Sequence, residues 1–179
     1  LWVADPYQPD HVHPCIGAKQ THAYQRLTQE DRARFDCLYE DFFYHRHTDF
    51  WFGEAMKKLS SLLSATSMTA CGEDLGMIPQ CVPWAMKNLQ VLSLEIQRMP
   101  KEYGVRFADT ASYPYLSVAT PSTHDMSTLR EWWTESAEET QHFYNHTLHR
   151  EGKAPSDMSG DIAKQILKQH LESPSMLAM

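Results

Sequence analysis

The 179 residues carry a formal charge of −7 and are 42% hydrophobic, a content that is sufficient for a globular interior and argues against disorder. The negative charge disfavours binding to the phosphate backbone of nucleic acids. No apolar run approaches the ~20 residues that a membrane-spanning helix needs. We therefore expect one domain by default, with neither nucleic acid nor a membrane as a partner.

The chain has cysteines at positions 15, 37, 71 and 81, and none has the Cys-x-x-Cys spacing of zinc clusters and redox motifs. This pattern is typical of reduced thiols in a cytoplasmic protein, with a secreted disulfide framework as the weaker alternative. The pairs His11/His13 and His45/His47 are two positions apart, and residues so spaced do not share a helix face. The sequence therefore predicts no metal site and no cofactor.

The first 64 residues predict an irregular segment followed by two helices. Residues 1–27 are rich in Pro and His, which favours irregular structure. Thr28 is a predicted N-cap, with Asp31 in the first turn. The helix that it begins has apolar residues at intervals of three and four, which predict one buried stripe: Phe35, Leu38, Tyr39, Phe42 and Phe43. A second helix is predicted over 49–64.

Strands and helices alternate from residue 65 onward. The predicted strands are 68–73, 91–97 and 115–120, and residues 98–112 are predicted to be a loop or a short helix. The predicted helices run from Pro79 to about 88, from the capping box Ser136-x-x-Glu139 to about 149, and from 161 to 172. This alternation indicates an α/β fold with a parallel sheet, in which chemistry gathers at the carboxyl ends of the strands.

Two of the predicted strands run directly into acidic residues, Glu73 in one case and Asp125 in the other. An uncompensated carboxylate at the mouth of a buried strand costs desolvation energy, so such residues tend to have a partner or a role. Two of them suggest the carboxylate pair that glycosidic-bond chemistry requires. Glu73 would be a general acid and base, because desolvation helps it to retain a proton. The alternative is that Glu73 caps the next helix or pairs with a lysine.

The neighbours of these carboxylates have their own interpretations. Asp74 faces away from Glu73 by the period of a strand, which favours a role in holding the turn through backbone N–H groups; it is also a candidate substrate-binding residue. Asp125 would hold sugar hydroxyls or stabilise positive charge at the anomeric carbon. The alternative is that it caps a helix beginning near Ser127. His124 would bind substrate by donating a hydrogen bond to a hydroxyl.

Aromatic residues cluster at two places in the sequence. Those at 42–44 and 50–52 are interpreted as core rather than as a sugar-stacking surface. Of the pair Trp132 and Trp133, one is predicted to be core and the other is a candidate for stacking on a sugar ring.

Three motifs resemble the amylomaltase/disproportionating-enzyme family of 4-α-glucanotransferases, within the α-amylase clan: Cys71-Gly-Glu-Asp-Leu-Gly76, Leu94-Glu-Ile-Gln-Arg-Met-Pro100 and Thr123-His-Asp-Met-Ser-Thr-Leu-Arg-Glu-Trp-Trp133. The stretches at 38–46 and 170–176 look like the longer branch found in plant cytosolic and Bacteroides-type enzymes. The resemblance covers about residues 28–179.

This resemblance implies a partial (β/α)8 barrel, with residues 65–179 supplying about strands five to seven and residues 1–64 forming a helical insertion before them. It implies a cytoplasmic enzyme that transfers α-1,4-glucan segments with retention, from maltodextrin, glycogen or starch-derived donors to glucose or glucan acceptors. Glu73 would be the acid/base, Asp125 the transition-state stabiliser and His124 a substrate-binding residue. The family's nucleophile lies in an Arg-Ile-Asp-His type segment that is absent here.

We therefore expect this sequence to be an internal fragment that is inactive alone, with the nucleophile upstream and apolar surface exposed where further strands would pack. Two alternatives stay open. One is a hydrolase of the same clan, in which water replaces the acceptor sugar. The other is a non-catalytic glucan-binding or structural piece.

Overall fold

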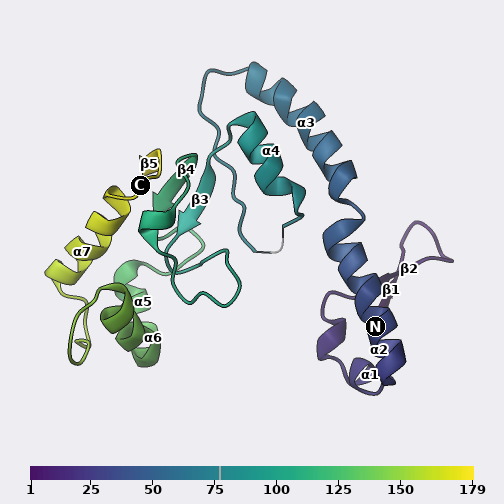
Figure 1. Cartoon of the computed structure of the whole chain (residues 1–179), viewed down its shortest axis with the longest axis horizontal. Helices are drawn as coiled ribbons and strands as arrows, with labels where there is room; N and C mark the ends of the chain where they lie inside the picture. Colours follow the sequence, from purple (N-terminus) through teal and green to yellow (C-terminus); the bar gives the residue numbers. More distant parts are fainter. Residues whose placement is uncertain (77) are drawn as a thin grey trace. The chain divides into compact units, whose positions relative to one another are not determined.

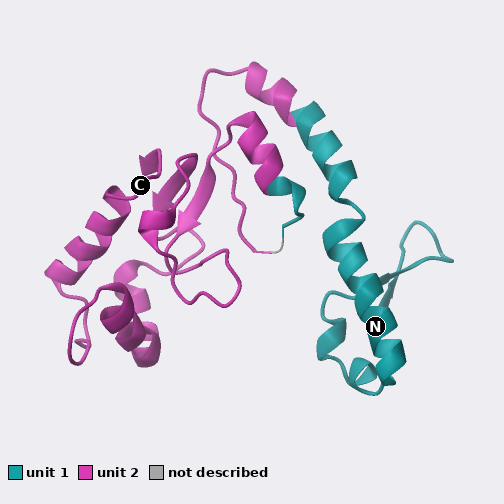
Figure 2. Ribbon diagram, in the orientation of Figure 1, with its two compact units in different colours: residues 1–58, 78–82 teal, residues 59–77, 83–179 magenta. Residues whose placement is uncertain are grey.

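The computed structural model describes residues 1–76 and 78–179, and it divides into two compact units (Figure 2). The first unit consists of residues 1–58 and 78–82, and the second holds the rest of the described chain. The helices α3, Thr48–Ser64, and α4, Cys81–Leu89, contribute residues to both units. The sequence-based division after residue 64 stays a prediction.

The first unit begins with a two-stranded antiparallel ribbon, β1 (Trp2–Ala4) against β2 (Val12–Pro14). The prediction of an irregular segment is therefore wrong in part. The Asp5 carboxylate accepts the N–H groups of Tyr7 and Gln8, at 2.7 and 2.9 Å, and this turn brings the two extended segments together. The ribbon leads into four helical elements: η1 Ala18–Gln20, α1 His22–Gln25, α2 Gln29–Glu40 and η2 Asp41–His45.

The helix α2 confirms the predicted N-cap, since Thr28 Oγ1 accepts the N–H of Asp31 at 3.1 Å. Phe35 and Tyr39 are buried against Ala18, whereas Leu38 at the side of the predicted stripe stays 39% exposed. The buried face of α2 is thus narrower than the spacing of its apolar residues predicts.

The helix α3 agrees with the predicted helix over 49–64, but none of its residues is buried. Phe50 and Trp51 are 62% and 52% exposed, so their interpretation as core residues is wrong for this structure. Their rings contact each other at 5.6 Å instead of joining the cluster around Phe35 and Tyr39.

The second unit contains a parallel sheet with the strand order β3–β4–β5 (Figure 1). Its strands are β3 Ser93–Ile96, β4 Ser117–Thr120 and β5 Leu177–Ala178. The predicted strands at 91–97 and 115–120 are confirmed, although both are shorter. On the free side of β3, Cys71 forms a single parallel bridge with Leu92. The prediction of a strand over 68–73 is therefore wrong, except that Cys71 makes this one bridge.

Further helices follow in the second unit, and its largest core cluster lies among them. They are η3 Thr110–Ser112, α5 Leu129–Glu135, α6 Ala137–His142, η4 Phe143–Thr147 and α7 Gly160–Leu171, of which α7 packs against β4. The predicted N-cap is confirmed, since Ser136 Oγ accepts the N–H of Glu139 at 3.3 Å, but the Glu139 carboxylate accepts from Arg106 and does not complete the capping box. The largest buried cluster lies between these helices: Trp133, Phe143, Leu148, Met158, Ile162 and Ile166. The helix predicted from Pro79 begins two residues later, and the one predicted over 161–172 is confirmed to within a residue at each end.

Within residues 1–76 and 78–179, every helix is too short or too polar to cross a lipid bilayer. The same residues contain no cluster of three or more His, Cys, Asp or Glu side chains that could hold a metal ion.

His170 makes the stability of the second unit sensitive to pH. The residue is 2% exposed, its Nδ1 contacts the Ile166 carbonyl at 2.8 Å, and its Nε2 has no partner among the described residues. Burial lowers the pKa of His170 below its ordinary value of 6.5, and the nearby Arg98 charge lowers it further, against the opposing bond to Ile166. The unfolded chain therefore binds a proton that the folded chain resists, so stability is complete above pH 6.5 and falls as the pH drops below it.

We expect His170→Gln, which cannot titrate, to flatten this dependence. The measurement is the thermal unfolding midpoint of the full-length protein at about pH 7.5 and about pH 5.5, for the wild type and the variant. His22→Gln, which removes an exposed histidine, is the control. An equal fall of the midpoint in all three proteins would contradict the prediction.

Candidate active site

Glu73 stands two residues beyond the Cys71 bridge and is exposed. The expectation that a strand end buries this carboxylate is wrong, because the strand stops after one bridge and the side chain lies past the end of the ladder. Neither structural alternative is present: the Glu73 side chain has no hydrogen bond or ion pair with any described residue, and α4 starts only at Cys81. Its carboxylate is thus open to a ligand.

Asp74 points the other way and is 5% exposed. Along β3, Gly72 N–H donates to Leu92 O at 2.8 Å and Leu92 N–H donates to Ala70 O at 2.9 Å. The next donor of this ladder is Leu94 N–H, and it donates to Asp74 Oδ1 at 3.0 Å. The carboxylate replaces the backbone acceptor that a longer strand would supply. Asp74 therefore holds the segment that contains Glu73 against β3. The predicted bonds from Asp74 to backbone N–H groups of its own turn are replaced by this bond to the neighbouring strand.

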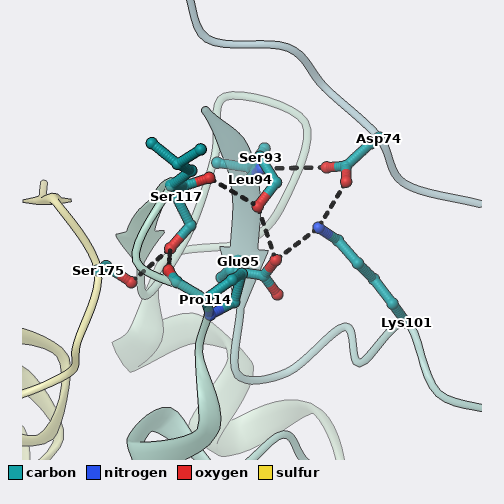
Figure 3. A network of polar contacts seen from close by, with 9 residues as sticks. Asp74, Ser93, Leu94, Glu95, Lys101, Pro114, Ser117 and Ser175 are labelled. Carbon is teal, nitrogen blue, oxygen red and sulfur yellow. Dashed lines mark hydrogen bonds and ion pairs between the residues drawn. The ribbon is translucent and has the colours of Figure 1, made fainter. Parts of the chain in front are cut away.

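Lys101 joins this segment to β3 a second time (Figure 3). Its Nζ lies 2.8 Å from Asp74 Oδ2 and 2.7 Å from Glu95 Oε1, and Ser93 Oγ donates to the same oxygen of Glu95 at 2.9 Å. The side chains of Asp74 and Glu95 are 6% and 13% exposed, so the one ammonium group offsets two largely buried carboxylates. Sequence reasoning missed both Lys101 and Glu95. The available signal was a polar strand face followed by a basic residue in the adjoining loop.

Two pockets adjoin this network. The larger, of about 480 Å³, contains Asp74, Glu95 and Lys101 in its wall and is completed by Pro83, Met86, Lys87, Val91, Ser93, Pro114, Tyr115 and Leu116. The second, of about 430 Å³, shares Glu95 and Lys101 with it and is also lined by Tyr113. The Tyr113 hydroxyl is buried without a partner among the described residues, and burial, together with the negative Glu95 and Asp109, raises its pKa. Glu73 and Asp125 line neither pocket.

His124 and Asp125 lie in the loop that follows β4. Their side chains are 85% and 71% exposed, and His124 Nε2 lies 3.2 Å from Asp125 Oδ2. The alternative that Asp125 caps the next helix is wrong, because α5 begins at Leu129 and its N-cap is Thr128, which accepts the N–H of Glu131 at 3.3 Å. Asp125 is therefore not committed to helix capping.

The two candidate carboxylates follow the carboxyl ends of segments that flank the same strand. Glu73 comes after the bridge on one side of β3, and Asp125 comes after β4 on the other side. Both segments run parallel to β3, and each carboxylate follows the carboxyl end of its own segment; Glu73 lies next to Asp74, which bonds to Leu94 within β3, and Asp125 lies five residues beyond the end of β4. No hydrogen bond connects Glu73 with His124 or Asp125 in the described part of the chain.

The tryptophan pair divides as predicted in one respect. Trp133 is 1% exposed and donates to Pro155 O at 2.9 Å, so it is a core residue. Trp132 is half-buried, packs against Phe143 with ring centroids 5.1 Å apart, and has the guanidinium of Arg98 over its ring at 5.1 Å. The ring that sequence reasoning proposed for sugar stacking is thus engaged by Arg98.

The sequence model of one protein family, glycoside hydrolase family 77, described as 4-alpha-glucanotransferase, matches residues 4–179 of this chain. The chain belongs to this family. Membership in family 77 confirms the resemblance seen in the three motifs, and the match extends further toward the start of the sequence than the motifs do. It also confirms a fold of mixed helix and sheet.

Several curated proteins are similar to this chain. A 4-alpha-glucanotransferase of rice (DPE2) is 36% identical over 177 residues, which are 99% of this chain and 19% of the rice protein. The 4-alpha-glucanotransferase of Chlamydia pneumoniae is 40% identical over 87 residues, 48% of this chain and 16% of that protein. The Haemophilus influenzae 4-alpha-glucanotransferase is 34% identical over 62 residues, 35% of this chain and 9% of its own length. The chain thus spans less than a fifth of the length of these relatives.

Proposed function

We propose that the protein containing these residues is a 4-α-glucanotransferase, which moves α-1,4-glucan segments from a donor such as a maltodextrin to glucose or another glucan. The observation that carries this proposal is the family match over residues 4–179. It is supported by two exposed acidic side chains, Glu73 and Asp125, beyond the carboxyl ends of parallel segments. We further propose that the protein acts in the cytoplasm and needs no cofactor.

The proposed architecture is part of a (β/α)8 barrel. The Cys71 segment, β3, β4 and β5 are parallel, and each lies next to the one that precedes it in the chain. Consecutive parallel neighbours with helices between them are the pattern of a singly wound barrel, whose active site lies at the carboxyl ends of its strands. The first three segments would be about strands five to seven, and β5 would be the next.

In the proposed reaction, Glu73 acts at the oxygen of the glycosidic bond. It donates a proton to that oxygen as the bond to the anomeric carbon breaks, and it later removes a proton from the attacking hydroxyl of the acceptor. The Asp125 carboxylate stabilises positive charge at the anomeric carbon, and His124 donates a hydrogen bond to a sugar hydroxyl. A retaining reaction also needs a nucleophilic carboxylate, and we propose that it comes from outside these 179 residues, because no segment here matches the family's motif.

Asp74 has a different place in this proposal. Because it is buried and both of its oxygens are engaged, by Leu94 N–H and by Lys101, we assign it to holding the Glu73 segment in place. The predicted direct contact of Asp74 with substrate would require both bonds to break.

The test uses the full-length protein, maltotriose as donor and isotopically labelled glucose as acceptor, with the products separated by chromatography. A transferase produces a ladder of shorter and longer glucans with the label at the reducing end. Glucose and maltose without labelled longer products would indicate the hydrolase of the same clan. Binding of maltotriose without any product would indicate a non-catalytic glucan-binding protein. Either of these outcomes overturns the proposal.

A further inference from the structure

Arg98 connects the end of β3 to the loop that carries His124 and Asp125. It lies two residues after the last residue of β3. Its Nε donates to the carbonyl of Pro121 at 3.2 Å, and its Nη2 donates to the carbonyl of Ser127 at 2.8 Å. These two carbonyls belong to the first and last residues of the loop 121–127. One planar guanidinium group therefore joins both ends of that loop.

Among the described residues, the rest of the loop makes only short-range hydrogen bonds. Ser122 Oγ donates to Ser127 O at 2.9 Å, and Thr120 Oγ1 donates to Ser122 O at 2.7 Å. At the tip, Asp125 N–H donates to Thr123 Oγ1 at 3.4 Å. The side chains of His124 and Asp125 at the tip are exposed and, among the residues that the structure describes, contact only each other. Their position therefore depends on how the base of the loop is held.

The guanidinium of Arg98 is itself held by its surroundings. It lies over the ring of Trp132, which packs against Phe107 and Phe143 at 5.9 and 5.1 Å. Burial lowers the pKa of Arg98, with the negative Glu135 opposing this, yet an arginine remains charged throughout the physiological range. A flat cation fixed on an aromatic face presents two N–H donors in a constant direction, which the single ammonium group of a lysine does not.

We propose that Arg98 is the positioning residue that fixes the loop 121–127 and thereby directs His124 and Asp125 toward the substrate. The proposal rests on the function proposed above for Asp125. Preorganised charge near a reacting carbon lowers the barrier only while its position is kept, and small displacements of a catalytic group are costly. Arg98 would act through Asp125 without touching the sugar.

The test compares Arg98→Ala and Arg98→Lys with Arg130→Ala in the full-length protein. Arg130 is a matched control, because it also donates to a backbone carbonyl, that of Met158 at 3.1 Å, but outside the loop. The first readout is hydrogen–deuterium exchange of the loop 121–127. The second is kcat and the donor KM for glucan transfer, with thermal unfolding of each variant as the measure of general damage.

We expect Arg98→Ala to speed exchange in the loop and to lower kcat by about 100-fold while the donor KM changes little. Added methylguanidinium should restore part of kcat in Arg98→Ala and none in Arg130→Ala, with equal sodium chloride as the salt control. Arg98→Lys should fall between the wild type and Arg98→Ala, because one ammonium reaches one carbonyl at a time.

The proposal is overturned if loop exchange in Arg98→Ala matches that in Arg130→Ala, or if faster exchange leaves kcat unchanged. A loss of kcat that follows the loss of thermal stability and resists methylguanidinium overturns it as well. If the wild-type protein makes no glucan ladder, the proposed function is wrong. Hydrogen–deuterium exchange of the loop 121–127 then still tests whether Arg98 fixes the loop.

Discussion

Glu73→Gln in the full-length protein lowers kcat for glucan transfer by about 1,000-fold, because glutamine cannot donate a proton to the leaving oxygen or accept one from the acceptor. The side chain is exposed and has no hydrogen bond or ion pair with a described residue, so the substitution leaves the thermal unfolding midpoint unchanged. The measurement is initial rates with maltotriose at saturating donor, together with thermal unfolding.

The control for this prediction is Glu151→Gln, which removes another exposed carboxylate from the same unit. A donor with a good leaving group sharpens the test: maltotriosyl fluoride needs little protonation, so Glu73→Gln should lose much less of the rate of the first step with this donor than with maltotriose. An equal loss with both donors would argue against Glu73 as the acid, and full activity with maltotriose would remove it from the mechanism.

Helix ends are the part of the fold that the sequence predicts best. Thr28 and Ser136 bond to the N–H three residues on, because an N-cap needs only a side-chain oxygen and a local turn. The strand at 91–97 is likewise predicted by its alternation of apolar and polar residues, and the strand at 115–120 by its small and apolar residues. These features depend on contacts near in the sequence or on burial alone.

The predictions that are wrong, and the residues that were missed, depend on contacts between residues far apart in the sequence. The run at 68–73 has a strand's composition, yet the ladder ends because Asp74, 20 positions from Leu94, takes over the N–H of that residue. Lys101 stands 27 positions from Asp74, and no local pattern indicates that the two meet. Phe50 and Trp51 have a core composition, but nothing in the first unit's core cluster covers them. The motif comparison found Glu73 and Asp125 without indicating what holds them.

Replacing each aspartate of the candidate site by asparagine should have a different main effect: a loss of kcat for Asp125 and a loss of stability for Asp74. Asp125→Asn lowers kcat by about 1,000-fold and leaves thermal unfolding unaltered, since the side chain is 71% exposed and is not a helix cap. Asp74→Asn lowers stability, because Asp74 is 5% exposed and its carboxylate faces Lys101. Removing one partner of a buried ion pair lowers the free energy of unfolding by about 3 kcal/mol. This is an upper value here, because Lys101 keeps its ion pair with Glu95.

The two variants are compared by kcat at saturating donor and by thermal unfolding of the full-length protein at the same pH. Asp74→Asn should also lower activity, but only in proportion to the fraction unfolded or to the displacement of Glu73, so lowering the temperature should recover part of it. Asp125→Asn should show no such recovery, because the lost charge is missing in the folded protein. If Asp74→Asn were as stable as the wild type yet inactive, Asp74 would be a substrate ligand and the network with Lys101 would not be what holds the Glu73 segment.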